Sequence, residues 1–252
     1  MTSHTMHTSV TLDVLMQDSG VTFGTSGARG RVMDMTDRVC YAYVTAFTVY
    51  ARGLGEAPPG GRVALAGDLR PSTPRILAAC SQALVDQGLM PVNLGTIPTP
   101  ALALYALEHR LPGLMVTGSH IPDDRNGIKF YRPQGEILKA DEIALRGVTI
   151  WLDPARFDAA GQWWSPPRVP DPIPDGHGAF VARYLDSFSP HCLRGLRVAV
   201  YEHSSVARES LAEVLAGLGA EVVCLGRSGQ FVPVDTEAIR PEDQVLARAW
   251  AK

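Results

Sequence analysis

A serine hydroxyl, a histidine imidazole and a lysine amine occur close together at Ser119, His120 and Lys129. The apolar run before the serine is typical of a strand, which brings the chain rigidly to the edge of a sheet. Gly118 allows a sharp turn there, and Pro122 prevents the next residues from forming a regular ladder. We therefore expect Ser119 to be exposed on a stiff support, where a hydroxyl beside a cation suits phosphoryl or acyl transfer.

The lysine is expected to return toward the serine through a turn. The pair at 126–127, Asn-Gly, is typical of a turn, and the segment 128–131 of a second short strand. There Lys129 would stabilise developing charge as a point cation or, with a depressed pKa, move a proton; the alternative is a solvated strand lysine. Two roles stay open for His120, acid–base catalysis or orientation of the loop, because adjacent residues on an extended segment point apart.

Three segments of the chain resemble one enzyme family. Thr-Gly-Ser-His-Ile-Pro at 117–122 and Asn-Gly-Ile-Lys at 126–129 resemble the phosphoserine loop of the alpha-D-phosphohexomutases, the family of phosphomannomutases and phosphoglucomutases. The segments 23–30 and 67–74 resemble the family in the same order. The main departure is Ile121, where the family usually has Asn. Three such motifs in order make the resemblance specific.

The resemblance implies that Ser119 is the phosphorylated residue of a phosphohexomutase. Its phosphoryl group would pass to a mannose or glucose phosphate and be recovered from the other oxygen of a hexose 1,6-bisphosphate, which interconverts the 1- and 6-phosphates. The family uses Mg²⁺, and the phosphate on Ser119 would supply a metal ligand. A serine phosphate suits this task because it is stable in water, yet transferable when Mg²⁺ and cations neutralise its charge of about −1.5 to −2. Serine identity alone, without the three motifs, would favour a turn former or helix N-cap over a phosphorylated residue.

The segment 24–30 is a loop of small residues whose amides can approach an anion. Arg29 adds a planar fork for phosphate oxygens. By the resemblance, Thr25, Ser26, Gly27 and Arg29 bind the substrate phosphate, and Arg29 also assists catalysis. The loop lacks the terminal Gly-Lys-Ser/Thr of a nucleotide P-loop. A simple surface turn is the alternative.

Other polar groups favour structural roles. Asp68 follows a predicted strand, and we expect it to pair with Arg70 and brace the loops, while Ser72 or Thr73 caps the next helix. The pair Asp123-Asp124 could bind a metal, but we favour solvent exposure of both carboxylates. The pair Ser204-Ser205 could bind a phosphate, but we favour helix capping.

Hydrophobic periodicity predicts alternating strands and helices in the first part of the chain. The expected helices are 39–54, 73–87 and 100–109, and the expected strands are 62–66, 90–94 and 113–117. Such βαβ order predicts an α/β fold whose functional residues lie at the carboxyl ends of the strands, as Asp68 and Ser119 do. A second series follows, with helices at 179–187, 205–218 and 241–252 and strands at 196–201 and 221–225. The predicted fold is two α/β domains with mixed, largely parallel sheets covered by helices, the second domain incomplete.

We predict a phosphohexomutase domain I at 1–150, a Pro-rich linker at 151–177 and a partial domain II at 178–252. Trp163 and Trp164 would pin the linker onto a domain surface. In the resembled family the second domain carries an Asp-Gly-Asp-x-Asp-Arg loop that holds magnesium, and nothing in this sequence matches it. The chain therefore resembles a truncated mutase, and we expect no turnover from it in isolation, because metal and positioning supply most of the rate enhancement.

Composition restricts the partners. The 252 residues are 46% hydrophobic and 19% charged, with a net charge of −3, which gives no broad basic field for nucleic acid. No apolar run is long enough for a membrane span, and the first ten residues lack an export leader, so we expect a cytoplasmic protein that binds neither membrane nor nucleic acid. The four cysteines are expected to be buried and reduced: Cys40, Cys80, Cys192 and Cys224.

Two rival functions remain at this point. One is a non-catalytic sugar-phosphate-binding or regulatory remnant that uses the same loops without turnover. The other is a serine hydrolase built from Ser119 and His120, although a triad needs base and nucleophile facing each other and no Gly-x-Ser-x-Gly elbow occurs.

Overall fold

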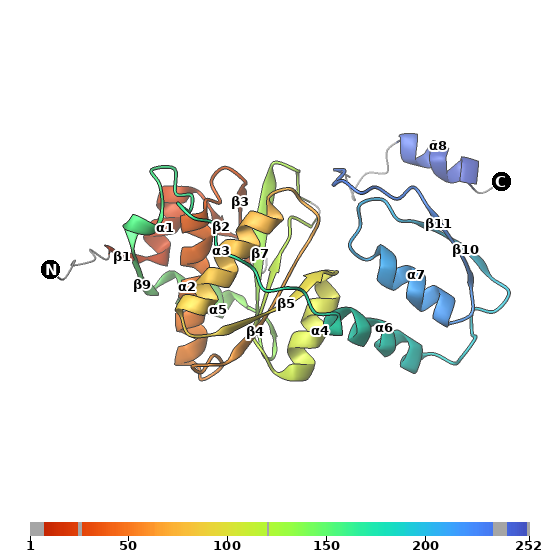
Figure 1. The fold of residues 1–252 in the computed structure, drawn as a ribbon, viewed down its shortest axis with the longest axis horizontal. Coiled ribbons are helices and arrows are strands. Elements are labelled where there is room, and N and C mark those ends of the chain that lie inside the picture. Colours follow the sequence, from red (N-terminus) through yellow and green to blue (C-terminus); the bar gives the residue numbers. More distant parts are fainter. Residues whose placement is uncertain (1–7, 25–26, 120, 234–240, 251–252) are drawn as a thin grey trace.

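A computed structural model describes residues 8–24, 27–119, 121–233 and 241–250 of the chain. Its main feature is a seven-stranded sheet (Figure 1), whose strands follow the order β2-β3-β7-β6-β4-β5, with β8 paired to β7. These strands are β2 Thr22–Phe23, β3 Gly27–Arg31, β4 Arg62–Gly67, β5 Met90–Thr96, β6 Gly113–Val116, β7 Arg125–Arg132 and β8 Gly135–Glu136.

The sheet is mixed, as expected, but its parallel part is confined to β5, β4 and β6. The pairs β6–β7, β7–β3, β3–β2 and β7–β8 are antiparallel. The helices α3 and α4 provide the crossovers that parallel neighbours need, whereas β6 and β7 are joined by a short loop that lets the chain turn straight back. A returning strand was expected after a turn at 126–127, but β7 already begins at Arg125, so the chain turns earlier, in the loop that carries Ser119.

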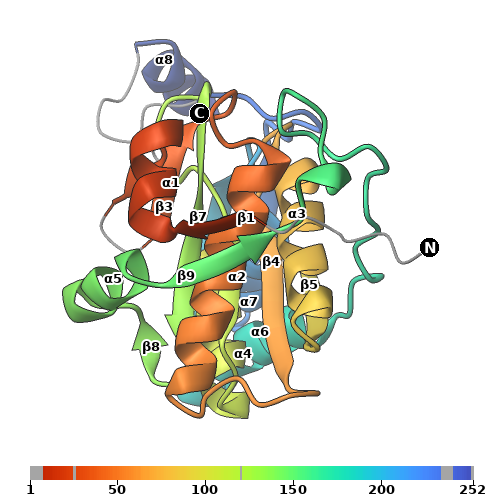
Figure 2. The same ribbon diagram turned by 90° about the vertical axis from the view of Figure 1, so that its left-hand side faces the viewer.

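Helices cover both faces of the sheet. They are α1 Leu12–Ser19, α2 Asp37–Gly53, α3 Thr73–Asp86, α4 Thr99–His109 and α5 Lys139–Arg146. Figure 2 looks onto the face covered by α2 and α3. Successive strand residues point to opposite faces, so Leu114 and Val116 join the core beneath α2 and α3, while Met115 joins the core beneath α4. Among the described residues, none of β3 belongs to this second core.

The segment expected to be a Pro-rich linker is partly structured. β9, Thr149–Leu152, pairs with β1, Thr8–Thr11, and a short 3₁₀ helix, η1, follows at Pro154–Arg156. Trp163 packs edge-on against Tyr41 at a ring-centroid distance of 5.6 Å, which pins this segment onto the first unit as expected. Trp164 is 70% exposed, so the same expectation is wrong for that residue.

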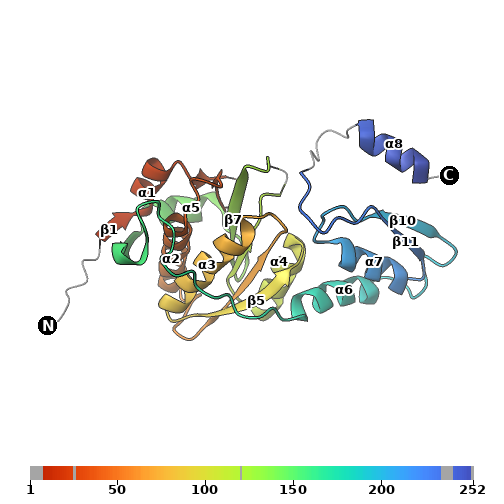
Figure 3. The ribbon, with the colours of Figure 1, turned by 45° about the horizontal axis from the view of Figure 1, so that its top comes forward.

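The second α/β unit consists of α6 Asp175–Ser187, β10 Arg197–Tyr201, α7 Arg208–Gly217, β11 Glu221–Leu225 and α8 Pro241–Trp250. α6 begins inside the expected linker and packs between α4 and α7 (Figure 3). Gly176 allows this approach, because a Cβ there would lie 3.1 Å from side-chain atoms of Leu94 and Ile97. β10 and β11 form a parallel two-stranded sheet.

The cysteines correct one expectation. Cys40 and Cys80 are buried and free, as predicted, but Cys192 and Cys224 are exposed and free. Cys224 lies on β11, and a sheet of two described strands encloses too little apolar volume to bury it. Among the residues that the structure describes, no helix combines the length and the apolar character needed to cross a bilayer.

Candidate functional site

Ser119 is exposed on the loop that leaves the carboxyl end of β6. Its φ is +50°, the left-handed region that non-glycine residues rarely adopt, and its amide donates a 2.9 Å hydrogen bond to the Thr117 hydroxyl. The Ile121 amide donates to the Gly118 carbonyl at 3.0 Å, which closes a tight turn around the serine. Such an uncommon backbone conformation persists only where surrounding contacts hold it.

Asp68, at the end of β4, supplies part of that support. One carboxylate oxygen accepts hydrogen bonds from the Thr117 hydroxyl at 2.9 Å and the Gly118 amide at 3.1 Å. The other accepts from the Arg70 amide at 3.0 Å and the Thr73 hydroxyl at 2.6 Å. One carboxylate thus joins the ends of β4 and β6 to the start of α3.

Arg70 supplies the remaining support, and its side chain is 3% exposed. Its terminal nitrogens donate to the carbonyl oxygens of Pro122 (2.9 Å), Arg125 (3.1 Å), Ile121 (2.6 Å) and Ser119 (3.4 Å). Its Nε lies 3.5 Å from Asp68 Oδ2, so the expected ion pair is present. Burial lowers the pKa of the Arg70 guanidinium and Asp68 raises it, yet an arginine stays charged in proteins.

Gly118 has a different role from the one expected. Its φ is outside the left-handed region, but a Cβ at this position would lie 2.1 Å from Arg70 Nε. The glycine is therefore required by the close approach of the guanidinium to the loop, while Ser119 takes the unusual φ.

The pair 126–127 forms part of β7 and is not the predicted turn. Asn126 is fully buried, and its amide donates to the hydroxyls of Ser72 at 2.9 Å and Thr73 at 3.1 Å. A Cβ on Gly127 would lie 2.8 Å from the Ala28 carbonyl oxygen, so the glycine permits close packing of β3 on β7. Ser72 occupies the N-cap position of α3 but makes no capping hydrogen bond.

Arg29 and Lys129 lie on the same face of the sheet. In the β3–β7 register, Arg29 faces Gly127, and Gly127 also accepts a hydrogen bond from the Thr117 amide. Arg29 is thus one strand away from the start of the Ser119 loop, and its side chain runs over Gly127. Lys129 lies two residues further along β7, about 7 Å from Gly127.

Lys129 is already paired. Its Nζ lies 3.2 Å from Glu136 Oε1, which also accepts a 2.7 Å hydrogen bond from the Tyr131 hydroxyl. Lys129 was expected to converge on Ser119. It does lie on the same face of the sheet as Arg29, but its ammonium group contacts Glu136 and not Ser119. Glu136 and Tyr131 were missed by the sequence analysis, although their spacing from Lys129 across a hairpin could have indicated the pairing.

Some predicted site residues cannot be placed. Thr25, Ser26 and His120 lie outside the described residues, so their roles stay predictions. Gly27 is buried, and a Cβ there would lie 2.1 Å from the Ile128 carbonyl oxygen, so it packs directly on β7. Asp123 and Asp124 are exposed, as expected. Within the described ranges, no group of three His, Cys, Asp or Glu side chains is arranged to hold a metal ion.

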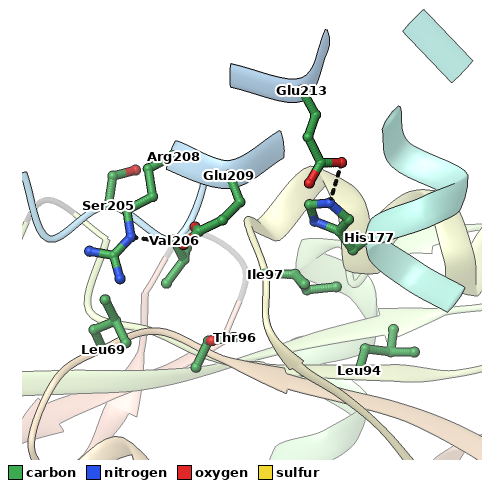
Figure 4. A pocket seen from close by; sticks show the side chains of 10 residues that line it. All are labelled: Leu69, Leu94, Thr96, Ile97, His177, Ser205, Val206, Arg208, Glu209 and Glu213. Carbon is green, nitrogen blue, oxygen red and sulfur yellow. Dashed lines mark hydrogen bonds and ion pairs between the residues drawn. The ribbon is translucent and has the colours of Figure 1, made fainter. Parts of the chain in front are cut away.

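A pocket of about 250 Å³ lies between parts of the two units, close to this site (Figure 4). Leu69, next to Asp68, lines it from the first unit, and His177 and Arg208 line it from the second. His177 Nε2 lies 2.8 Å from Glu213 Oε2, which joins α6 to α7.

The two serines between β10 and α7 do not cap the helix as predicted. The N-cap residue of α7 is Ala207, and the Ser205 hydroxyl only accepts a 3.1 Å hydrogen bond from its amide. The Ser204 hydroxyl instead donates to the Val232 carbonyl and accepts from the Val232 amide.

Comparison with known proteins gives consistent matches. Residues 20–146 match the family described as phosphoglucomutase/phosphomannomutase, alpha/beta/alpha domain I. A phosphomannomutase of Sinorhizobium fredii is 43% identical over 233 residues, which cover 92% of this chain and 48% of the relative. A phosphomannomutase of Salmonella muenchen is 42% identical and covers 96% and 48%, and a phosphoglucosamine mutase of Cereibacter sphaeroides is 33% identical and covers 81% and 45%. The chain spans about half the length of these relatives.

Solved structures agree in fold. A phosphoglucomutase/phosphomannomutase family protein from Burkholderia thailandensis superposes with a TM-score of 0.61 at 24% identity, covering 86% of this chain and 44% of that one. A structure from Thermus thermophilus superposes with a TM-score of 0.67 at 21% identity, covering 91% and 51%. At these identities the likeness supports the architecture alone.

Proposed function

This chain belongs to the phosphoglucomutase/phosphomannomutase family, and from that premise we propose that it takes part in phosphohexomutase chemistry with Ser119 as the phosphoryl carrier. The observation that carries the proposal is the set of contacts that hold the backbone around Ser119 in place. Its hydroxyl stands on an exposed loop whose backbone is held by a buried arginine and by Asp68, with Arg29 on the adjoining strand. This geometry suits a group that accepts and returns a phosphoryl group without being displaced.

Phosphoryl transfer in this site has two balanced steps. In the first, the bond between phosphorus and Ser119 Oγ breaks and a bond to a hydroxyl oxygen of the hexose phosphate forms, while the proton of that hydroxyl passes, in net terms, to Ser119 Oγ. In the second, the bond between the sugar oxygen and the other phosphoryl group of the hexose 1,6-bisphosphate breaks, that group bonds to Ser119 Oγ, and the proton of the Ser119 hydroxyl passes, in net terms, to the released sugar oxygen. The proposed substrate is a mannose or glucose phosphate. The names of the two phosphomannomutase relatives support mannose.

Arg29 and Lys129 would act as cations. The planar fork of Arg29 suits phosphate oxygens. Arg29 pairs with Gly127, and the Gly127 carbonyl binds the amide of Thr117, where the Ser119 loop begins. Lys129 must leave Glu136 to reach a phosphate, and a charge of about −1.5 to −2 on Ser119 or substrate competes well with one carboxylate. We propose binding of the sugar phosphate by Thr25, Ser26 and Gly27, and acid–base or orienting work by His120, on the family resemblance alone.

Mg²⁺ and a hexose 1,6-bisphosphate are the cofactors we propose for the complete reaction. The part of the chain that the structure describes offers no carboxylate set for the metal, and only the phosphate on Ser119 would be a ligand. We expect this 252-residue chain to accept a phosphoryl group without completing isomerisation, in the cytoplasm and without nucleic acid or membrane partners.

The test is intact-mass spectrometry of the chain after incubation with glucose or mannose 1,6-bisphosphate. We expect a gain of about 80 Da from one phosphoryl group. The Ser119→Ala variant should show no gain, whereas Ser205→Ala, which removes a hydroxyl in the second unit, should be labelled like the wild type. Binding of the sugar phosphate without labelling would instead favour the non-catalytic remnant.

A further inference from the structure

The guanidinium of Arg70 binds the Ser119 loop through the N–H groups at its edge. An arginine has five N–H donors in one plane. Four hydrogen bonds run to loop carbonyls, and Nε faces the Asp68 carboxylate. Only the flat faces of the group remain for other contacts. Whatever covers such a face keeps water away from these hydrogen bonds and so strengthens them.

A residue of the second unit covers one of these faces. The ring centroid of Phe231 lies 4.8 Å from Arg70 Cζ, within the range of a cation–π contact. Phe231 follows β11 and is half-buried, whereas Arg70 follows β4 of the first unit. The contact therefore joins the two units at the group that holds the phosphoryl carrier.

The backbone around Phe231 is anchored within its own unit. The Ser204 hydroxyl, after β10, accepts a 3.0 Å hydrogen bond from the Val232 amide. Arg208, in the first turn of α7, donates at 2.7 Å to the carbonyl of Ser228. These bonds fix the segment to β10 and α7, so the Phe231 ring moves together with the second unit.

We propose that Phe231 is a positioning residue through which the second unit sets the conformation of the Ser119 loop, by covering the Arg70 guanidinium. The proposal rests on the carrier role of Ser119 given above. When the ring lies on Arg70, the four carbonyls are held and Ser119 keeps its left-handed backbone. When the units move apart, water reaches the guanidinium and the loop loosens, so acceptance of the phosphoryl group depends on closure of the two units.

Hydrogen exchange of the amides at 117–125 tests the structural part. Phe231→Leu keeps an apolar side chain but removes the ring, and we expect these amides to exchange about ten-fold faster, the size expected for one partly desolvated cation–π contact. Phe231→Tyr keeps the ring and should restore wild-type exchange. Ser204→Ala should reproduce part of the effect without altering the first unit. Phe188→Leu, at an exposed phenylalanine after α6, is the matched control and should stay within about two-fold of wild type.

The rate of Ser119 phosphorylation by glucose 1,6-bisphosphate tests the functional part. Phe231→Leu should lower the maximal rate by about ten-fold and leave the half-saturating concentration within about two-fold, because the ring acts on the loop and not on the sugar. Protection of the β10 and β11 amides must match wild type, which shows that the second unit is folded. Equal loop exchange in Phe231→Leu and Phe188→Leu, or failure of Phe231→Tyr to restore it, overturns the proposal. If even the wild type is not phosphorylated, the carrier role fails, and the exchange measurements still decide whether Phe231 sets the loop.

Discussion

The carboxylate of Asp68 accepts a 2.9 Å hydrogen bond from the hydroxyl of Thr117, and this contact joins the carboxyl ends of β4 and β6. The two residues are far apart in the sequence, yet both follow strands that are parallel neighbours in the sheet. Because Thr117 in turn accepts from the Ser119 amide, the carboxylate supports the serine through one intermediate side chain.

Replacing Asp68 by Asn should destabilise the protein. The amide side chain removes the negative charge that faces buried Arg70 and places N–H groups where donors already point. We expect a loss of about 2 to 4 kcal/mol in the free energy of unfolding, measured by urea titration with circular dichroism. Asp123→Asn, at an exposed position of the same loop, should change it by less than about 0.5 kcal/mol. Equal stability of the two variants would contradict this account of the loop.

Gly127→Ala should also destabilise the protein. The added methyl would lie 2.8 Å from the Ala28 carbonyl and 3.2 Å from the Thr117 carbonyl, so backbone must move. We expect a cost of about 1 to 3 kcal/mol, measured by thermal and urea unfolding. The control is Gly178→Ala in α6, where nothing lies within 4 Å and helix propensity predicts a gain of up to about 1 kcal/mol. A Gly127→Ala protein as stable as wild type would show that β3 and β7 can separate freely.

Asp141 should make stability depend on acidic pH. Burial alone would raise the pKa of its carboxyl, but hydrogen bonds from Tyr50 and the Leu138 amide, with the charge of Arg132, outweigh burial and lower it. The unfolded chain therefore binds this proton first as the pH falls. The stabilisation is complete above the ordinary aspartate pKa of about 4 and is lost as the pH falls through the lower folded value.

The measurement is urea unfolding of wild type and Asp141→Asn between pH 3 and pH 7. We expect the variant to be less stable by about 2 kcal/mol near neutral pH, and the difference to shrink at the acidic end. Asp13→Asn, which removes a more exposed ion pair with Arg146, should cost less than about 1 kcal/mol. A difference for Asp141→Asn that stays constant over the whole range would rule out this titration as its source.

Lys129→Met should separate catalysis from stability. The pair with Glu136 is partly exposed, so its loss should cost at most about 1 kcal/mol of unfolding free energy. Phosphorylation of Ser119 by a hexose 1,6-bisphosphate should fall by about 10²-fold or more, as expected when a cation that stabilises developing charge is removed. Lys139→Met, which removes an exposed lysine paired with Glu142, is the matched control and should be phosphorylated at the wild-type rate. A wild-type rate for Lys129→Met would remove the lysine from the reaction.

The four thiols should react in two classes. Cys192 and Cys224 are exposed, whereas burial raises the pKa of Cys40 to about 12 and that of Cys80 well above its ordinary value. Because only the thiolate attacks a disulfide reagent, we expect two fast thiols in the native chain and four after denaturation. Rapid reaction of all four would mean that the packing between α2 and α3 opens readily.

Local patterns were sufficient for most of the secondary structure. The helix expected at 39–54 is α2, Asp37–Gly53, whose N-cap Thr36 accepts a hydrogen bond from the Val39 amide. The strands expected at 62–66 and 113–117 are β4 and β6, and they carry Asp68 and Ser119 to one edge of the sheet. Periodicity and turn residues are properties of neighbours in the chain, which is why they can be read without coordinates. β1, β2, β3, β8 and β9 were missed because short strands acquire their pairing from distant partners. The helices α1 and α5, each eight residues long, were also missed.

The α/β architecture, the family motifs and the display of Ser119 after a strand could all be inferred from the order of residues. The folded chain was needed to show that 126–127 belongs to a strand, that Lys129 pairs with Glu136, and that Arg70 binds the loop carbonyls beneath Phe231. Each of these depends on register or on contact between segments remote in the chain. A guanidinium has several possible partners of equal chemistry, and packing of the whole fold selects among them.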